Sequence, residues 1–277
     1  MSALALCVTF LLAFSKIIMC LPQTDIEKKM EGDIQANDLL NVCLESTTHK
    51  KEPGAEEDLI DECSPWKKNA CCTPDTVEKA HKFSLYAADY DMCPQKKMSE
   101  KCKTHFIRDT CFYECSPNIG PWKEQIDTAP RKQRFRDVPL CYSECKDWFD
   151  ACAEDYTCAD NWTKNYDNLN NTNNQTHFCE KGPAISCKPM KDVFGKPENF
   201  CEKIWDNSWK VVNDSEPCMK LSFDTENGNP NSLVAEKYAY ERFGRTPKQS
   251  NSSAFNMSVP NNALLFLIII LINYCIT

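Results

Sequence analysis

The residues best suited to do chemistry gather in one stretch, Cys102–Arg134. Cysteines form cross-links, a carboxylate accepts hydrogen bonds, and guanidinium groups donate them. The stretch combines three cysteines with an acid, a tyrosine and a short basic cluster, namely Cys102, Cys111, Cys115, Asp109, Tyr113, Arg131, Lys132 and Arg134. We therefore expect it to be the hub of a cross-linked scaffold that also presents polar groups.

Two pairs of cysteines are each spaced four residues apart: Cys111 with Cys115, and Cys141 with Cys145. On a helix, side chains at this spacing share a face with Cβ atoms about 5–6 Å apart. A disulfide requires about 3.5–4.5 Å between Cβ atoms. Each pair is therefore expected to point outward and bond two other segments, with Asp109 near the face of the first pair.

The two ends have the composition of processing signals. The apolar run Leu4–Phe14 is too short to span a bilayer and predicts a signal peptide cleaved after Cys20. Near the other end, the apolar run Ala263–Ile272 follows a polar spacer and small residues around Ser252. This order predicts a GPI anchor attached at Ser252. The alternative, a transmembrane helix, needs about 20 apolar residues.

The predicted organisation has five parts. They are a signal peptide (1–20), a flexible leader (21–38), one ligand-binding domain (39–243), a stalk with the anchor region (244–254) and a removed tail (255–277).

The cysteine count supports both the predicted cleavage of the signal peptide and the predicted removal of the C-terminal tail. Of 19 cysteines, Cys7, Cys20 and Cys275 are lost, which leaves 16, enough for eight disulfides. With only four histidines, disulfides are favoured over metal sites. Adjacent Cys71 and Cys72 should bond separate partners. A secretory route is also indicated by the N-glycosylation motifs, expected to carry glycan at Asn161, Asn170, Asn174, Asn213 and Asn251, with a further motif at Asn256.

Charge and motifs exclude several function classes. The chain has 40 acidic and 32 basic residues, or 31 basic residues once Lys16 leaves with the signal peptide, a net charge of about −9. An acidic protein is a poor partner for nucleic acid. Enzyme motifs such as G-x-S-x-G, HExxH and C-x-x-C do not occur. We expect a monomeric binding protein without catalytic residues, metal or cofactor.

Hydrophobic periodicity and breakers predict the main elements. A polar loop over 161–175 is expected to be exposed. Helices are expected over 76–90, 99–115, 139–155, 198–212 and 232–243.

Five runs of residues resemble one family. They are LLNVC (39–43), PWKKNACC (65–72), HFIRDTCFYECSPNIGPW (105–122), VPLCYSEC (138–145) and GNPN (228–231), and they resemble the folate receptors, of the folate receptor/riboflavin-binding protein group. The resemblance implies an α+β fold of small helices and short strands, rich in disulfides, with one deep open ligand pocket. It also implies the pairs Cys43–Cys71, Cys63–Cys111, Cys72–Cys115, Cys93–Cys187, Cys102–Cys152, Cys141–Cys218, Cys145–Cys201 and Cys158–Cys179.

The resemblance also assigns residues to a folate site. Asp109 matches the family's acid, which would accept the adjacent N–H and amino donors of the pterin ring bidentately. The alternative for Asp109 is an exposed helix residue paired with Arg108 or Lys103. The other matches would bond the pterin edge or wall its faces: Arg131, Arg134, Ser208, Tyr113, Trp205 and Tyr86.

The part of the site for the aminobenzoyl and glutamate groups is reduced. Trp162 and Lys164 match family residues, but Tyr166 stands where the family has tryptophan. Further departures are Pro130 and Asn168 in place of tryptophan and Thr163 in place of histidine. Losing aromatic walls should weaken stacking by roughly 1–3 kcal/mol in total. We therefore expect folate to be held mainly by its pterin ring.

The expected function is a GPI-anchored cell-surface receptor that binds folate and reduced folates, carries them into endosomes and releases them in acid. The alternative is an adhesion member of the same family that does not bind folate, like the egg-surface protein Juno. Riboflavin is a further candidate ligand, but its ring edge lacks the donor pair that calls for an acid such as Asp109.

Overall fold

The computed structural model describes residues 25–82, 85, 90–93, 96–126, 131–164 and 187–246. The chain divides into two compact units, one made of Met1–Glu31 with Lys248–Thr277 and the other of Gly32–Pro247. Every predicted ligand-binding residue belongs to the second unit.

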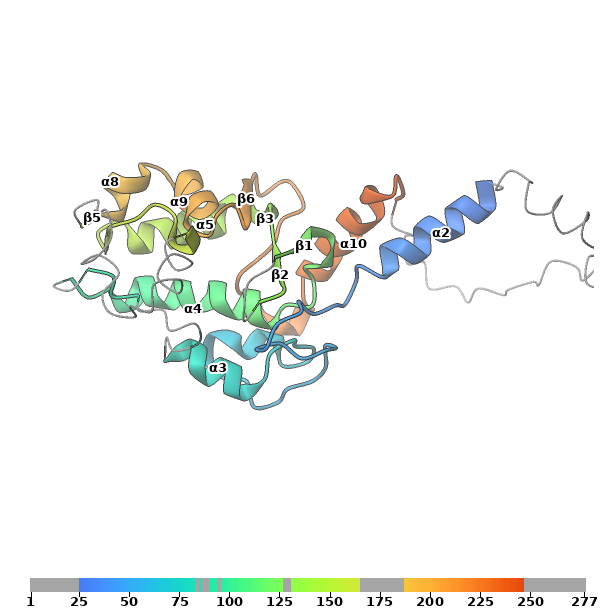
Figure 1. Cartoon of the computed structure of the whole chain (residues 1–277), viewed down its shortest axis with the longest axis horizontal. Coiled ribbons are helices and arrows are strands. Elements are labelled where there is room, and N and C mark those ends of the chain that lie inside the picture. Colours follow the sequence, from blue (N-terminus) through green and yellow to red (C-terminus); the bar gives the residue numbers. More distant parts are fainter. Residues whose placement is uncertain are drawn as a thin grey trace, which may run out of the picture. The chain divides into compact units, whose positions relative to one another are not determined.

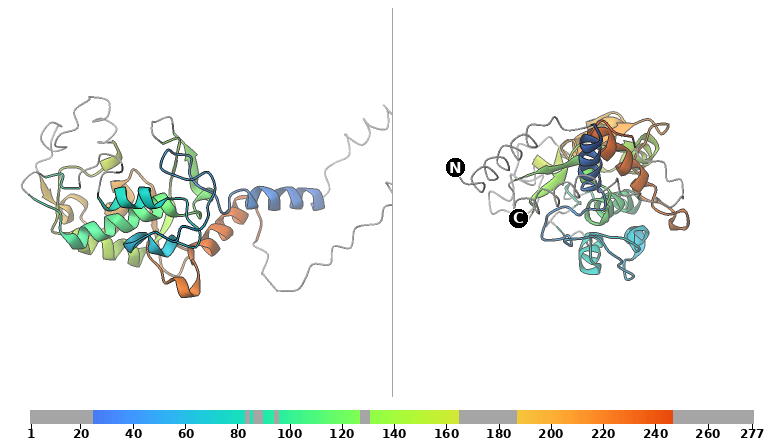
Figure 2. Two further views of the ribbon diagram at one scale, coloured as in Figure 1. Left: turned by 90° about the horizontal axis from the view of Figure 1, so that it is seen from below. Right: turned by 90° about the vertical axis from the view of Figure 1, so that its right-hand side faces the viewer.

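Helix α4 (Glu100–Cys115) is the element around which the second unit is built. Its N-cap Ser99 accepts a hydrogen bond from the Cys102 N–H, and it ends where Ser116 turns to extended backbone before Pro117. It packs against η1 (Asp61–Trp66), α3 (Pro74–His81) and α5 (Tyr142–Cys152), as Figure 1 shows and the view from below in Figure 2 supports. The helix predicted over 99–115 is confirmed.

Two predicted helices are wrong at one end because a strand replaces a turn of helix. Residues 139–155 begin with strand β3 (Val138–Cys141) before α5, and residues 198–212 divide into α9 (Pro197–Ile204) and strand β6 (Trp209–Val212). The strands pair in parallel, with Val138 opposite Trp209. Pairing between segments so far apart in the chain is invisible to local periodicity.

Two other boundaries also differ from expectation. The helix predicted over 76–90 ends at His81, the last residue of α3. The expected leader 21–38 contains helix α2 (Asp25–Asn37), and its Ala36 is buried against Ala239 and Tyr240. These last two residues lie in α10 (Asn231–Arg242), which confirms the helix predicted over 232–243.

The remaining elements are short. Strands β1 and β2 pair antiparallel, as do β4 and β5. Their bounds, with those of the small helices, are β1 Lys123–Gln125, β2 Gln133–Phe135, β4 Tyr156–Thr157, β5 Lys188–Pro189, η2 Gly120–Trp122, α8 Met190–Phe194 and η3 Thr225–Asn227. The fold is therefore the α+β arrangement of small helices and short strands that the sequence predicts.

Disulfides attach the neighbouring elements to α4 and to one another. Cys111 and Cys115 bond different segments rather than each other, as their helical spacing predicts. Cys158 is also disulfide-bonded, but its predicted partner Cys179 lies outside the described residues. Seven disulfides join described residues, and each is a pair that the resemblance implies: Cys43–Cys71, Cys63–Cys111, Cys72–Cys115, Cys93–Cys187, Cys102–Cys152, Cys141–Cys218 and Cys145–Cys201.

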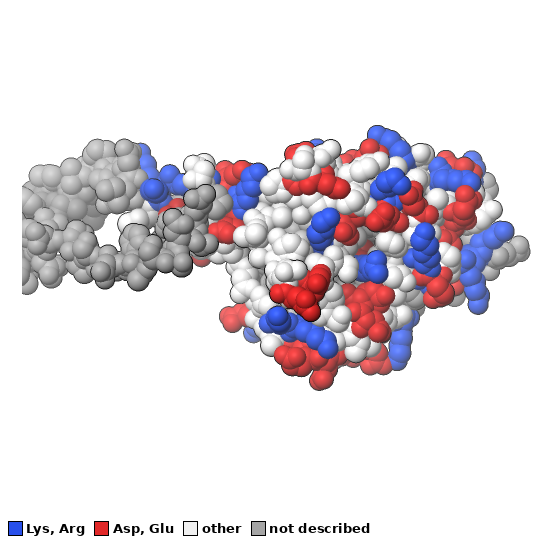
Figure 3. Space-filling view, turned by 180° about the vertical axis from the view of Figure 1, so that it is seen from behind, with Lys and Arg blue, Asp and Glu red and all other residues white. Residues whose placement is uncertain are grey.

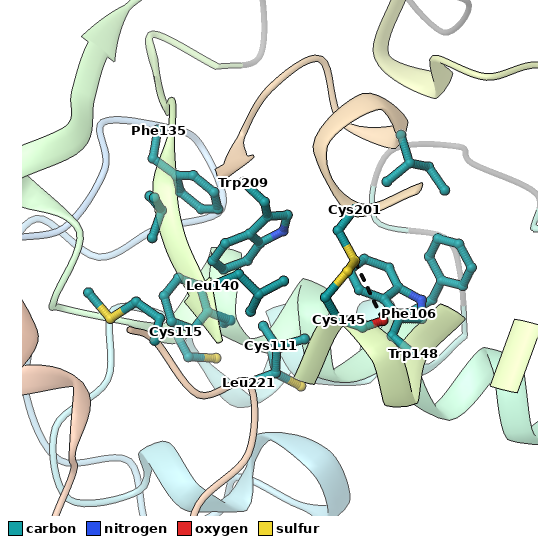
Figure 4. Close-up of a cluster of buried hydrophobic side chains, with 14 of the residues drawn as sticks. Phe106, Cys111, Cys115, Phe135, Leu140, Cys145, Trp148, Cys201, Trp209 and Leu221 are labelled. Carbon is teal, nitrogen blue, oxygen red and sulfur yellow. Dashed lines mark hydrogen bonds between the residues drawn. A yellow bond between two sulfur atoms is a disulfide. The ribbon is translucent and has the colours of Figure 1, made fainter. Parts of the chain in front are cut away.

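The core is aromatic and lies on the inward face of α4. Phe106 is fully buried, and Figure 4 shows it beside Trp148 and the Cys145–Cys201 disulfide. Phe112 and Phe135 pack around Trp209, with the Phe112 and Trp209 ring centroids 4.8 Å apart. Interlocked rings of this kind restrict the backbone on both sides, so α4 and β6 are held in one position relative to each other.

The surface carries mixed charge. Acidic and basic side chains are interspersed on the face drawn in Figure 3. Several form pairs one helical turn apart, such as Lys79 with Asp75 and Lys237 with Glu241. Exposed pairs contribute about 0–1 kcal/mol each, so they do little to hold the fold. Within the described residues, no helix is both long and apolar enough to cross a bilayer.

Gly120 is required by a close backbone approach. A Cβ at this position would lie 2.0 Å from the Leu39 carbonyl oxygen, which is far inside van der Waals contact. Gly120→Ala should therefore lower the free energy of unfolding by about 1–3 kcal/mol, measured by denaturant titration of the oxidised protein. The matched control is Gly54→Ala, whose Cβ would meet only Lys50 Nζ at 3.6 Å and should leave stability within about 0.5 kcal/mol. Equal unfolding midpoints for the two variants would contradict this packing.

Candidate ligand-binding site

Asp109 lies on the buried face of α4 and is only 5% exposed. The alternative of an exposed aspartate paired with Arg108 or Lys103 is thereby excluded. Its carboxylate accepts a hydrogen bond from the Trp209 indole N–H, with 2.8 Å between Asp109 Oδ1 and Trp209 Nε1. The parallel pairing of β6 with β3 is what brings Trp209 over α4, where Figure 4 shows it beside Phe135.

Burial has a large effect on the ionisation of Asp109. It raises the pKa of the carboxyl from 3.8 to about 7, against the opposing influence of the Trp209 and Trp205 indole N–H groups. The Trp205 indole N–H lowers the pKa of Asp109 because it stabilises the ionised carboxylate, although it does not reach hydrogen-bond geometry. This N–H is buried and has no hydrogen-bond partner among the described residues. Asp109 is thus a buried acceptor whose carboxyl holds its proton more tightly than an ordinary aspartate does.

Tyr113 follows Asp109 by one helical turn, so both side chains lie on one face of α4. It is half-buried, and its hydroxyl donates to the Gln133 carbonyl at 3.4 Å. Burial raises the pKa of Tyr113 to about 12, while the nearby positive charges of Arg131 and Arg134 act in the opposite direction. The structure therefore brings both predicted arginines close to the predicted aromatic wall.

Arg134 is buried, and acidic groups of the protein surround it. Its Nε lies 2.9 Å from Glu124 Oε1, an ion pair without good hydrogen-bond alignment. Its Nη1 lies 3.4 Å from Asp206 Oδ2, and its Nη2 donates to the Asp206 carbonyl oxygen. The strand pair β1–β2 places Glu124 opposite Arg134. The guanidinium is thus already engaged by the protein.

Trp205 and Ser208 lie in the connection between α9 and β6. Trp205 is half-buried and packs edge-on against Trp162, with ring centroids 5.7 Å apart. Ser208 is 7% exposed and its hydroxyl donates to the Trp205 carbonyl at 2.9 Å, which leaves its oxygen lone pairs able to accept. Ser208 is therefore attached to Trp205, and Trp205 is the one of the two that is close enough to Asp109 to lower the pKa of its carboxyl.

Trp162 is placed differently from the expectation that it lines the ligand. It is fully buried, its ring stacks on Phe106 with centroids 4.9 Å apart, and its N–H donates to Thr157 Oγ1 at 3.1 Å. With no exposed surface, it supports Trp205 from behind instead of facing a ligand.

Lys164 is exposed, and its ammonium pairs with the protein's own carboxylate at Asp206, 2.9 Å from Oδ1. Thr163 is half-buried. Tyr86, predicted as a wall of the pterin ring, lies outside the described residues. So do three positions predicted for the tail of the ligand, namely Pro130, Tyr166 and Asn168.

Sequence reasoning missed three residues that organise the site: Trp209, Glu124 and Asp206. The periodicity of residues 198–212 predicts that Trp209 lies in a helix, although the dipeptide Asp206-Asn207 shortly before it indicates that the helix ends there. Both residues have positive φ, 51° and 60°, which Asp and Asn tolerate better than other side chains. Glu124 and Asp206 act through contacts distant in sequence and leave no local pattern.

One group of possible metal ligands and two of the predicted glycan sites fall among the described residues. Among the described residues one group could offer metal ligands, Cys141, Asp214 and Cys218, but the two cysteines are bonded to each other. Asn213 is exposed, whereas the Asn161 amide is half-buried and donates to Asp206 Oδ1. The predicted glycan sites Asn170, Asn174 and Asn251, and the anchor residue Ser252, lie outside the described residues.

Taken together, the described residues make a site with one buried acceptor, an unpaired indole donor and an aromatic wall. A flat ring that offers two adjacent donors would match Asp109, because a carboxylate can accept both.

The comparisons with known proteins agree on one family. The Folate receptor family model matches residues 42–220. The chain is 42% identical to folate receptor alpha of Homo sapiens over 215 residues, which cover 76% of this chain and 80% of that protein. It is 44% identical to folate receptor alpha of Bos taurus over 218 residues, 76% and 87% of the two chains. Riboflavin-binding protein of Gallus gallus is 29% identical over 199 residues, 71% and 75% of the two chains. The chain therefore belongs to the folate receptor family.

Proposed function

We propose that this protein is a receptor that binds folate by its pterin ring. The observation that carries the proposal is the buried carboxylate of Asp109, held by Trp209 within reach of the Trp205 indole. A buried acid with spare acceptor capacity is costly for a fold to maintain unless something uses it. The relatives named folate receptor alpha, at 42% and 44% identity, support folate as that partner.

The proposed binding mode has the pterin donors on Asp109 and the ring between Tyr113 and Trp205. Ser208 and Arg131 contact the pterin edge. Tyr86 adds a further wall. In this mode Arg134 acts through the ion pairs that fix Asp206 and Glu124, and Lys164 and Tyr166 border the tail of the ligand.

Titration of the purified domain with folic acid and pteroic acid tests this proposal. Pteroic acid lacks the glutamate, so it should bind within about tenfold of folic acid if the pterin ring carries most of the affinity. Riboflavin is the control, because its ring edge does not offer the donor pair, and it should bind much more weakly. Loss of nearly all binding on removal of the glutamate would contradict a pterin-anchored site.

The second candidate is a family member that mediates adhesion and does not bind folate. It is favoured by one observation, the engagement of Arg134 and Lys164 by Asp206. A folded, fully oxidised domain that binds none of the three ligands would support this candidate and overturn the folate proposal.

The proposed cellular setting is the outer face of the plasma membrane, through a GPI anchor at Ser252, with uptake to endosomes. Phosphatidylinositol-specific phospholipase C should release the protein from intact cells, and deletion of residues 255–277 should cause its secretion. Retention on cells after phospholipase treatment would exclude the lipid anchor and favour a protein segment in the membrane.

A further inference from the structure

Asp206 is the centre of an ion-pair network that joins three segments of the site. Its Oδ1 lies 2.9 Å from Lys164 Nζ and accepts from Asn161 Nδ2 at 2.9 Å. Its Oδ2 lies 3.4 Å from Arg134 Nη1 and 3.9 Å from Arg136 Nη2. Asp206 is therefore paired with cations from two other segments. Lys164 comes from the segment after Cys158, and Arg134 and Arg136 lie in strand β2 or next to it.

The backbone at Asp206 favours this arrangement. The residue directly follows Trp205 and has a φ of 51°, so the chain turns sharply beside the aromatic wall. Its carbonyl oxygen accepts from both Arg134 and Arg136. Burial alone would raise the pKa of the Asp206 carboxyl, but the hydrogen bonds from Lys164 and Asn161 and the nearby charges lower it overall. Asp206 is therefore a carboxylate at neutral pH.

Lys164 is the cation on which an acidic ligand tail would depend, and Arg134 pairs with the same Asp206 carboxylate. A carboxylate already 2.9 Å from the Lys164 ammonium takes the place that a ligand carboxylate would otherwise fill. Glu124 lies 2.9 Å from Arg134 Nε and 2.8 Å from Arg136 Nε, so two carboxylates of the protein offset two of the three positive charges in the network. A ligand carboxylate brought to Lys164 would have to compete with the Asp206 carboxylate already paired with it.

We propose that Asp206 is a specificity-determining residue whose carboxylate substitutes for that of a ligand, so that the site favours pterin ligands whose tails carry one carboxylate or none over those, such as folate, whose tails carry two. The inference rests on the proposed function, because it concerns the tail end of the same site. It extends that proposal by naming the residue and the ligand class. The preference among ligand tails then has two causes, the negative charge of Asp206 and the loss of aromatic walls.

The test compares Asp206→Asn with the unaltered domain, using folic acid and pteroic acid as probes. Both proteins are produced without N-glycosylation, because the substitution creates an Asn-x-Ser motif at positions 206–208. Asparagine tolerates positive φ and keeps the backbone bonds to the arginines, so the fold should be retained. The variant should bind folic acid roughly three- to tenfold more tightly, with pteroic acid changed less than about twofold. Adding Lys164→Gln to Asp206→Asn should remove the gain.

The matched control is Asp214→Asn, which makes the same change of charge at a carboxylate that accepts from the Ser143 N–H instead. It should alter neither ligand. The unaltered domain gives a second readout without any variant: its ratio of folic acid to pteroic acid affinity should stay at or below about one from low to high salt. A ratio far above one at low salt that collapses in high salt would overturn the inference.

The outcomes separate this inference from the proposed function. Equal effects of Asp206→Asn on both ligands, or weaker folic acid binding, would overturn the role of Asp206 while folate binding stands. Folic acid binding by Asp206→Asn alone, with none by the unaltered domain, would support the role and contradict the proposed function. Failure of every form to bind either ligand would overturn both.

Discussion

Replacing Asp109 with alanine should weaken folic acid binding by roughly 30-fold to several thousand-fold. In the proposed binding mode the change removes the buried carboxylate that accepts the two pterin donors and leaves those donors without partners inside the protein. Loss of one side of a buried charge-assisted pair costs about 2–5 kcal/mol, and each 1.4 kcal/mol is tenfold in affinity. Isothermal titration of the purified domain measures the effect directly.

A matched control separates ligand contact from general damage. Asp155 is also a buried aspartate with two hydrogen bonds, from the Ser99 N–H and hydroxyl at 2.7 Å each, and it lies at the start of α4. Asp155→Ala should lower stability more than Asp109→Ala but leave folic acid affinity within about twofold. Similar losses of affinity in both variants would mean that Asp109 supports the fold and not the ligand.

Folic acid affinity should fall by roughly 10- to 100-fold between about pH 7.5 and pH 5.5. The pterin donors favour the ionised form of Asp109, whose pKa in the free protein is about 7 because burial raises it. Below that pH the carboxyl is protonated and can no longer accept both donors, so affinity declines with each unit of acidification. Titrations across this range measure the slope, and calorimetry in two buffers should also detect a proton released on binding near neutral pH.

The same pKa predicts the opposite trend for the stability of the free protein. A folded-state pKa above the value of the unfolded chain means that the folded state holds its proton more tightly. The contribution of Asp109 to stability is therefore fully present below about pH 4 and is lost as pH rises through about 7. Asp109→Asn should flatten this part of the stability profile. A folic acid affinity that is independent of pH would exclude ionised Asp109 as the acceptor of the pterin donors.

The position of Asp109 and Tyr113 on one face of α4 could be predicted from their spacing, whereas their role as ligand contacts came from the family resemblance. Asp109 and Tyr113 are one helical turn apart, and Phe106 and Phe112 fall on the same side, so a single periodic segment places the acid against the core. The cysteine spacing of α4 likewise predicted that its partners lie on other segments.

The rest of the site depends on contacts that local patterns do not encode. The register of β3 with β6 decides that Trp209 meets Asp109, and it joins residues about 70 positions apart. Asp206 reads in the sequence as an ordinary exposed acid, yet the fold surrounds it with Lys164, Arg134 and Asn161. Trp162 matched a ligand-facing position but became part of the core, because Phe106 and Trp205 cover its ring.

Diffraction from crystals of the oxidised domain grown with pteroic acid would test the central claim most directly. The account predicts the pterin ring between Tyr113 and Trp205, with its ring N–H and amino nitrogen each within about 3.2 Å of an Asp109 carboxylate oxygen. A ligand bound elsewhere, or a pterin edge turned away from Asp109, would contradict it.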